Sequence, residues 1–302
     1  MSTFKWFTAV AIVSTIVLLA QGEAYCPGNV ASLRFKPSPR SQIIVPVTIN
    51  HTGPFNFLVD TGTQFTMIDP SLAGELHLQP KGTAELVGVG FKTTASFARV
   101  DSLEVGSRVI PNHLVELQDL RMLQSADLQF QGILGGLFLD HFDVLIDYAH
   151  GLLCLDDQKT MRSLVKGVRL ELPATPRESA DAPTRGLVII PVRLESAGPR
   201  QLYLALDSGS NVPFLYDPDK YLPPQLVPQL SVAGQGGDGT KQSFSMLPSQ
   251  DLQIGSIKLQ QISFVVPSNS DHEAPVDGLL ATALFRSVFI SYVDHFLILT
   301  PR

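Results

Sequence analysis

An internal repeat restricts the possible folds of this chain more than any other feature. Residues 57–63 read FLVDTGT and residues 204–210 read LALDSGS, at an offset of 147. Three further segments recur in the same order at nearly the same offset: 43–47 (IIVPV) as 188–192 (VIIPV), 103–107 (LEVGS) as 252–256 (LQIGS), and 132–134 (GIL) as 278–280 (GLL). The repeat therefore predicts two copies of one structural unit.

Each copy has the pattern of a β-rich unit. Apolar and polar residues alternate through 98–105 and 251–259, which is typical of half-buried strands. Short helices are expected after Asp69-Pro70 and Asp217-Pro218, after Leu134 and Leu280, and around 160–165. With 44% hydrophobic and 17% charged residues, the chain suits a globular fold with a sizeable core. We predict an all-β protein of two similar lobes related by a pseudo-twofold axis, with a few short helices.

The first 24 residues have the three-part pattern of a secretory signal peptide. Lys5 precedes an apolar run over 6–20, and the small residues Gly22 and Ala24 prepare a cut after residue 24. An uncleaved anchor is the alternative, but the run is shorter than the roughly 20 residues of a membrane span. We expect a protein secreted or exported to the periplasm, with no membrane contact after cleavage. The remaining chain divides into an N-terminal extension (25–39), an N-terminal lobe (40–157), a proline-containing inter-lobe linker (158–185) and a C-terminal lobe (186–302).

The mature chain would contain two cysteines, Cys26 and Cys154. In an oxidising compartment they could form a disulfide. Alternatively, Cys154 is an ordinary buried thiol in the apolar run 151–155. The sequence leaves both interpretations open.

The repeat places one aspartate at the same point of each copy, Asp60 and Asp207. If both lie near a pseudo-twofold axis, the two carboxylates face each other. Like charges so close cannot both ionise cheaply, so the pair would share one proton. Such a pair supplies one acid and one base for amide hydrolysis through an activated water. Around them, glycines allow a tight turn and hydroxyls can bind the carboxylates; these residues are Gly62, Thr63, Gly209 and Ser210.

These motifs resemble those of the pepsin/retropepsin class of aspartic proteases, in a compact bilobal form, from about residue 40 to the end of the chain. By this resemblance Asp60 and Asp207 would be the catalytic dyad. Thr61 and Ser208 would lock the two loops together, and Thr63 and Ser210 would orient the carboxylates. The segment 133–135 (ILG) matches the apolar-apolar-Gly element of that family.

The chain departs from the family pattern at two points. In the second copy Ala281 stands where the family usually has glycine. The flap tyrosine of the pepsin branch is missing, because no tyrosine lies between Tyr25 and Tyr148. We expect the flap, which would cover bound substrate, at Val87, Gly88, Val89 and Gly90. The segment 233–239 could form a second flap.

Other functional classes fit less well. A net charge of −6 argues against a nucleic-acid partner. The GxGxxG pattern at 234–239 precedes a predicted strand rather than a helix, which argues against a dinucleotide cofactor. We expect no cofactor and no metal. The expected function is an aspartic endopeptidase, a monomer that acts on peptides or unfolded proteins. The alternatives are a catalytically inactive relative that binds peptides or proteins, and a structural or sensor β-protein.

Overall fold

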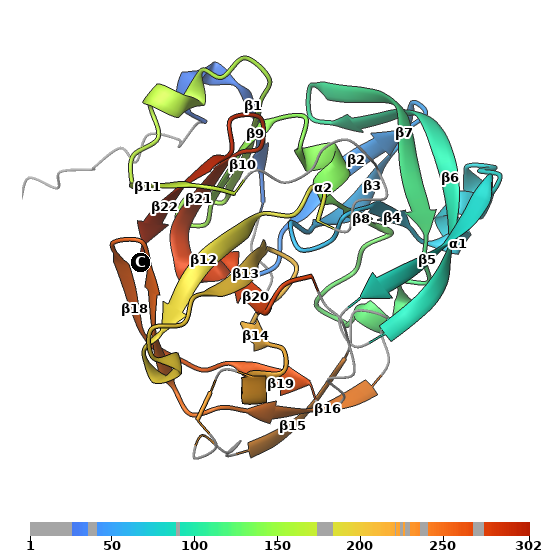
Figure 1. The fold of residues 1–302 in the computed structure, drawn as a ribbon. Helices are drawn as coiled ribbons and strands as arrows, with labels where there is room; N and C mark the ends of the chain where they lie inside the picture. Colours follow the sequence, from blue (N-terminus) through green and yellow to red (C-terminus); the bar gives the residue numbers. More distant parts are fainter. Residues whose placement is uncertain are drawn as a thin grey trace, which may run out of the picture.

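The computed structural model describes residues 26–35, 41–88, 91–173, 184–220, 222–223, 226, 230–235, 241–267 and 275–302. The predicted signal peptide (1–24) lies outside these ranges. Within them the chain is nearly all β, with three sheets and two short α-helices (Figure 1). The predicted all-β fold of two lobes is confirmed.

The first sheet forms the N-terminal lobe. Its seven strands, in spatial order, are β2 (Ile44–Ile49), β3 (Thr52–Val59), β8 (Gly132–Leu134), β4 (Thr66–Ile68), β7 (Arg108–Leu117), β6 (Phe91–Val105) and β5 (Gly82–Gly88). Strand β2 also pairs with the end of β6, so that the sheet curls into a barrel-like layer.

The second sheet forms the C-terminal lobe. Its nine strands, in spatial order, are β15 (Leu230–Gln235), β16 (Lys241–Met246), β19 (Val265–Pro267), β14 (Phe214–Leu215), β20 (Gly278–Ala281), β13 (Leu202–Asp207), β12 (Ile189–Leu194), β17 (Gln250–Ile254) and β18 (Ile257–Ile262).

The third sheet joins the two halves of the chain. Its six strands, all antiparallel, are β1 (Ala31–Arg34), β10 (Leu152–Asp156), β9 (Asp143–Asp147), β21 (Phe285–Ser291), β22 (Phe296–Pro301) and β11 (Val168–Glu171). The two halves meet where β9 pairs with β21. The edge strands β1 and β11 come from the segments predicted as an extension and a linker, and residues 174–183 of that linker lie outside the described residues. The lobe boundaries stay predictions.

The helices are short and lie where local signals predicted them. Asp69 caps α1 (Pro70–Glu75) by accepting a hydrogen bond from the Ser71 N–H at 2.9 Å, and Pro70 occupies the first helical position. Helix α2 (Gly136–Leu139) follows Leu134. The 3-10 turns are η1 (Pro27–Asn29), η2 (Arg121–Leu123), η3 (Met161–Ser163), η4 (Glu195–Ala197), η5 (Pro218–Lys220) and η6 (Thr282–Leu284). Over the described part of the chain, no helix has the length and apolar character needed to span a membrane.

The strand that carries each aspartate pairs the same way in both lobes. In the N-terminal lobe β3 runs parallel to β8, with Val59 opposite Leu134. In the C-terminal lobe β13 runs parallel to β20, with Asp207 opposite Ala281. One hydrophobic core continues through both lobes and the connecting sheet, because buried side chains from all three sheets are in mutual contact. The aspartate strands are therefore fixed on a common rigid base.

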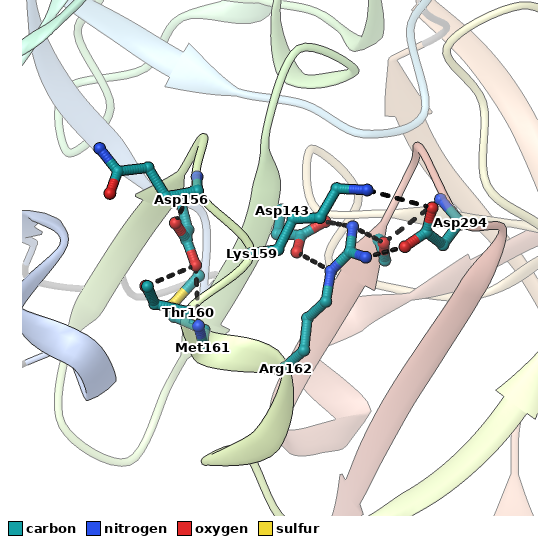
Figure 2. A network of polar contacts seen from close by, with 9 residues as sticks. Asp143, Asp156, Lys159, Thr160, Met161, Arg162 and Asp294 are labelled. Atoms are coloured by element: carbon teal, nitrogen blue, oxygen red, sulfur yellow. Dashed lines mark hydrogen bonds and ion pairs between the residues drawn. The ribbon is translucent and has the colours of Figure 1, made fainter.

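A buried ion-pair network fastens η3 to the third sheet (Figure 2). The Arg162 guanidinium donates to both carboxylate oxygens of Asp143, whose side chain is 1% exposed, and to the Ser291 hydroxyl at 2.8 Å. It also pairs with Asp294 in the turn between β21 and β22. One side chain thus joins the linker to strands from both halves of the chain.

Candidate active site

The two lobes bring Asp60 and Asp207 together at their junction. Asp60 directly follows β3, and its N–H donates to the Leu134 carbonyl at 3.1 Å. Asp207 ends β13 and is 6% exposed. Both aspartates follow buried apolar residues, so each carboxylate is held at the end of a strand rather than on a free loop.

The residue after each aspartate locks its loop to the opposite loop. The Thr61 hydroxyl donates to the Leu206 carbonyl at 2.8 Å and accepts from the Ser208 N–H at 3.1 Å. Reciprocally, the Ser208 hydroxyl donates to the Val59 carbonyl at 2.8 Å and accepts from the Thr61 N–H at 3.1 Å. Both side chains are buried, and their hydroxyls are used once as donor and once as acceptor.

Each glycine leaves space for the carboxylate of the opposite lobe. A Cβ on Gly62 would lie 2.5 Å from Cγ of Asp207, and a Cβ on Gly209 would lie 2.6 Å from Cγ of Asp60. No side chain fits at such distances. The two carboxylates therefore face each other across the junction, each above the other loop's glycine.

Main-chain N–H groups of the same loops donate hydrogen bonds to both carboxylates. Gly62 N–H donates to Asp60 at 2.7 Å, and the N–H groups of Gly209 and Ser210 donate to Asp207 at 2.7 and 2.9 Å. The Ser210 hydroxyl does not bind the carboxylate; it donates to the Val212 carbonyl at 2.6 Å. Thr63 also reaches Asp60 through a main-chain hydrogen bond. The expectation that the Ser210 hydroxyl donates to the carboxylate is wrong, because its one proton is donated to the Val212 carbonyl; Ser210 instead contacts Asp207 through its main-chain N–H.

The environment favours a shared proton. Burial raises the pKa of Asp60 well above its ordinary value, and the neighbouring Asp207 carboxylate raises it further. Burial also raises the pKa of Asp207, while hydrogen bonds from Asp60 and the two N–H groups offset part of this rise. The raised pKa values favour a form in which the two carboxyls share one proton and titrate as a unit.

The two copies differ in the segment that supports each aspartate loop. A Cβ on Gly135 would lie 2.2 Å from the Phe65 carbonyl oxygen, so this position requires glycine. Its counterpart Ala281 is 1% exposed and stays paired with Asp207. The alanine therefore leaves the parallel pairing of β20 with β13 in place.

The expected flap lies on a hairpin beside the N-terminal loop. Val87 and Gly88 end β5, and Gly88 pairs with Phe91 at the start of β6. Val89 and Gly90 lie outside the described residues. In the C-terminal lobe β15 and β16 form a corresponding hairpin, and residues 236–239 of the second expected flap (233–239) also lie outside the described residues.

Sequence reasoning missed three residues that contact the active-site loops. The Gln42 side chain donates to the Gly209 carbonyl at 2.8 Å and so links the lobes. The Thr282 hydroxyl donates to the Asp207 carbonyl at 3.5 Å and is hydrogen-bonded to the Tyr148 hydroxyl at 2.7 Å. Tyr148 stands at the same place in its copy of the repeat as Tyr292 does in the other, so the repeat pointed to it. No sequence pattern pointed to Gln42 or Thr282.

Cys26 and Cys154 are joined by a disulfide with Cα atoms 5.8 Å apart. The bond attaches the segment before β1 to β10. It packs in a hydrophobic cluster with Leu145, Met161 and Phe289 on one side of the third sheet. The disulfide lies in the sheet that supports both lobes.

Comparison with known proteins gives one family match and a similarity to a solved structure. Residues 45–138 match the family described as aspartyl protease. No curated protein matches the chain. A solved retropepsin-like aspartic protease from Rickettsia conorii aligns with a TM-score of 0.31 and 20% identity, over 42% of this chain and 90% of that one. The family match lies in the N-terminal lobe and includes Asp60, and it supports the resemblance to pepsin/retropepsin-like aspartic proteases drawn from the sequence.

Proposed function

We propose that this aspartic protease is an endopeptidase in which Asp60 and Asp207 activate a water molecule between them. One observation carries the proposal: the two carboxylates oppose each other across the lobe junction, each above the glycine of the other loop. Their raised pKa values support a singly protonated pair. The intact pair gives no support to the alternative of an inactive peptide-binding relative.

In the proposed mechanism the ionised carboxylate takes a proton from the water, and the resulting hydroxide oxygen attacks the peptide carbonyl carbon. The protonated carboxyl donates its proton to the carbonyl oxygen. In the tetrahedral intermediate the carbon–nitrogen bond then breaks. The nitrogen leaves with the proton that the dyad holds, and one hydroxyl of the intermediate gives its proton to the other carboxylate as the new carboxyl group forms, so the pair is again singly protonated. No covalent bond to the protein forms.

The two hairpins support the endopeptidase assignment. Strands β5 and β6 project from the N-terminal lobe, and β15 and β16 project from the C-terminal lobe (Figure 1). An extended peptide lying between the lobes could add to these strands through main-chain hydrogen bonds. We propose a monomer, because one chain supplies both carboxylates.

We also propose that the mature protein acts outside the cytoplasm. The N-terminal pattern of residues 1–24 and the Cys26–Cys154 disulfide support this location, since disulfides persist mainly in oxidising compartments.

The function is tested by incubating the protein with an unfolded protein substrate from pH 3 to 8. Products are identified by mass spectrometry, with Asp60→Asn and Asp207→Asn variants in parallel. We expect internal cleavage by the wild type and none by either variant. Asp219→Asn, an exposed aspartate in η5, is the matched control and should cleave normally. Cleavage that survives both dyad substitutions would contradict the mechanism, and a folded wild type without activity would favour the peptide-binding relative.

A further inference from the structure

A buried carboxyl group outside the dyad has no role in the proposed mechanism. Glu116 lies in β7 and is 2% exposed. Its Oε2 atom has no hydrogen-bond partner among the described residues. An unpartnered buried carboxyl is costly, so such a group in a folded protein calls for an explanation.

Glu116 lies in the middle of an apolar row that crosses the N-terminal sheet. It pairs with Met67 of β4 on one side and with Phe97 of β6 on the other. Beyond Met67 the row continues through the paired residues Ile133, Leu58 and Ile44. Residues directly opposite each other on neighbouring strands share a face of the sheet. Glu116 is therefore the single ionisable residue in this row, and the five other residues are apolar.

This row lies on the same side of the sheet as the Asp60 carboxylate. Asp60 directly follows β3, and its N–H continues the pairing with β8 by donating to the Leu134 carbonyl at 3.1 Å. Side chains alternate along an extended strand, so Leu58 and Asp60, two residues apart, point to the same face. Val59, between them, points into the main core. Strand β7, which carries Glu116, is separated from β8 only by β4 (Figure 1).

The surroundings of Glu116 connect it to the active-site loop. Phe97, its partner on β6, stacks edge-on against Phe65 with ring centroids 4.9 Å apart. Phe65 follows Asp60 by five residues, and it also packs with Ala95 and Leu137. Burial raises the pKa of Glu116 to about 7, and no cation contributes to this shift. The group is thus a carboxyl in apolar surroundings beside the active-site loop, and no salt bridge joins it to a positive side chain among the described residues.

We propose that Glu116 is a specificity-determining residue that receives a lysine or arginine side chain of the peptide substrate. The inference rests on the proposed endopeptidase function. The long methylene stem of such a side chain would lie against apolar neighbours such as Phe97 and Met67, and its charged end would meet the Glu116 carboxylate. The substrate would then supply the partner that the free protein lacks.

The test compares basic and isosteric neutral side chains. A digest of an unfolded protein by the wild type first shows at which position relative to the cleaved bond basic residues are enriched. Two peptides are then made with lysine or norleucine at that position, since norleucine has a similar carbon chain without the ammonium group. kcat/KM is measured for both peptides with wild type, Glu116→Gln and Glu116→Asp. Glu104→Gln is the matched control, because Glu104 lies on β6 and already accepts a hydrogen bond from the Ser102 hydroxyl at 3.0 Å.

We expect the wild type and the control to prefer the lysine peptide by about tenfold or more, as for a charged hydrogen bond. The Glu116→Gln variant should lower the ratio to about one, and Glu116→Asp should retain part of it. General damage to the fold would lower kcat/KM for both peptides and leave the ratio unchanged. If Glu116→Gln does not fold, a reduced ratio in Glu116→Asp is required instead.

Two results would overturn the inference while leaving the endopeptidase function intact: wild-type cleavage without enrichment of basic residues at any position, or an unchanged ratio in the folded Glu116 variants. A wild type that cleaves nothing would instead contradict the proposed function, and the inference with it.

Discussion

At the scale of single residues, identical side chains acquire opposite properties from their neighbours. Burial alone would raise the pKa of Asp69, but hydrogen bonds from Ser71 and from the Leu120 N–H outweigh burial, and the pKa is lowered. Asp60 and Asp207 also accept main-chain hydrogen bonds, yet their pKa values are raised. Asp69 and Asp207 are equally buried, each 6% exposed, so burial alone does not separate them; for Asp60 the neighbouring Asp207 carboxylate raises the pKa further. The chemistry of the dyad therefore depends on its being a pair.

The first prediction concerns the pH dependence of activity and stability. In the proposed mechanism the singly protonated pair is the active form, so kcat/KM should follow a bell-shaped pH profile. Its alkaline limb should lie above the ordinary range of aspartate, because the pKa of Asp60 is raised well above it. The raised pKa values of Asp60 and Asp207 also make the free energy of unfolding depend on pH. Above the unfolded pKa of about 4, the folded protein binds more protons than the unfolded chain, and the free energy of unfolding falls as pH rises.

Kinetics from pH 3 to 8 and denaturant unfolding at the same pH values measure both effects. Asp60→Asn should abolish activity and remove part of the fall of stability above pH 4, while the part that comes from the raised pKa of Glu116 remains. An activity that rises monotonically to pH 8 would be inconsistent with a shared proton.

The second prediction concerns Gly62. In Gly62→Ala the new Cβ would lie 2.5 Å from Cγ of Asp207, so the carboxylate must move. A displacement of about 1 Å at a reacting group can lower the rate by roughly 100-fold. We expect kcat to fall by about this factor. Gly74→Ala is the control, since no atom lies within 4 Å of its Cβ in helix α1. It should keep full activity and gain about 0.5–1 kcal/mol of stability. Near-normal kcat in a folded Gly62→Ala variant would contradict the opposed arrangement.

The sequence identified those active-site residues that stand in the repeated motif. The aspartates, the glycines and the hydroxyls of Thr61 and Ser208 stand in a repeated motif, so they could be identified. Gln42 and Thr282 could not, because a glutamine or threonine contacting a distant loop leaves no local pattern. The role of the Ser210 hydroxyl depended on the turn that places the Val212 carbonyl within its reach, and no sequence pattern indicates that turn.

At the scale of elements, local signals predicted the strands and short turns better than their partners. Pro70 after the capping Asp69 indicated α1. The pairing of β1 with β10 and of β11 with β22 joins segments more than 100 residues apart, and each edge strand has only four residues. Such short strands carry little periodicity, and their stability comes from the sheet they join. For that reason the sequence predicts an extension and a linker where these two strands lie.

The third prediction concerns the attachment of η3 to the third sheet. Arg162→Met removes the positive partner of Asp143, whose side chain is 1% exposed. Leaving a buried carboxylate unpaired costs about 3–5 kcal/mol, so the free energy of unfolding should fall by about that amount. Denaturant unfolding at pH 7 measures the change.

Lys159→Met provides the comparison within the same network (Figure 2). Lys159 meets Asp294 at 3.5 Å, and its side chain is 52% exposed. This substitution should cost no more than about 1 kcal/mol. Equal effects of the two substitutions would mean that the buried pair with Asp143 does not stabilise the fold more than a surface contact does.

At the scale of the whole molecule, two lobes must hold one carboxyl pair in a fixed geometry. The hydrogen bonds of Thr61 and Ser208 join the lobes at the site, and the third sheet joins them at its base. The repeat predicted the two lobes and their shared axis. The third sheet lies partly outside the repeat and combines strands from both halves of the chain, so no single segment indicated it.

The fourth prediction concerns the disulfide that closes this base. Cys26 and Cys154 are 128 residues apart in sequence, and a crosslink over so long a loop reduces the entropy of the unfolded chain by an amount worth about 4–5 kcal/mol. Reduction, or the double substitution of both cysteines by alanine, should lower the free energy of unfolding by up to this amount. Activity in the absence of denaturant should persist, because the bonds between the aspartate loops do not involve either cysteine. The measurement is guanidinium unfolding with and without reductant, together with peptide cleavage under the same conditions. Loss of cleavage on reduction while the fold is intact would show instead that the base of the molecule sets the geometry of the dyad.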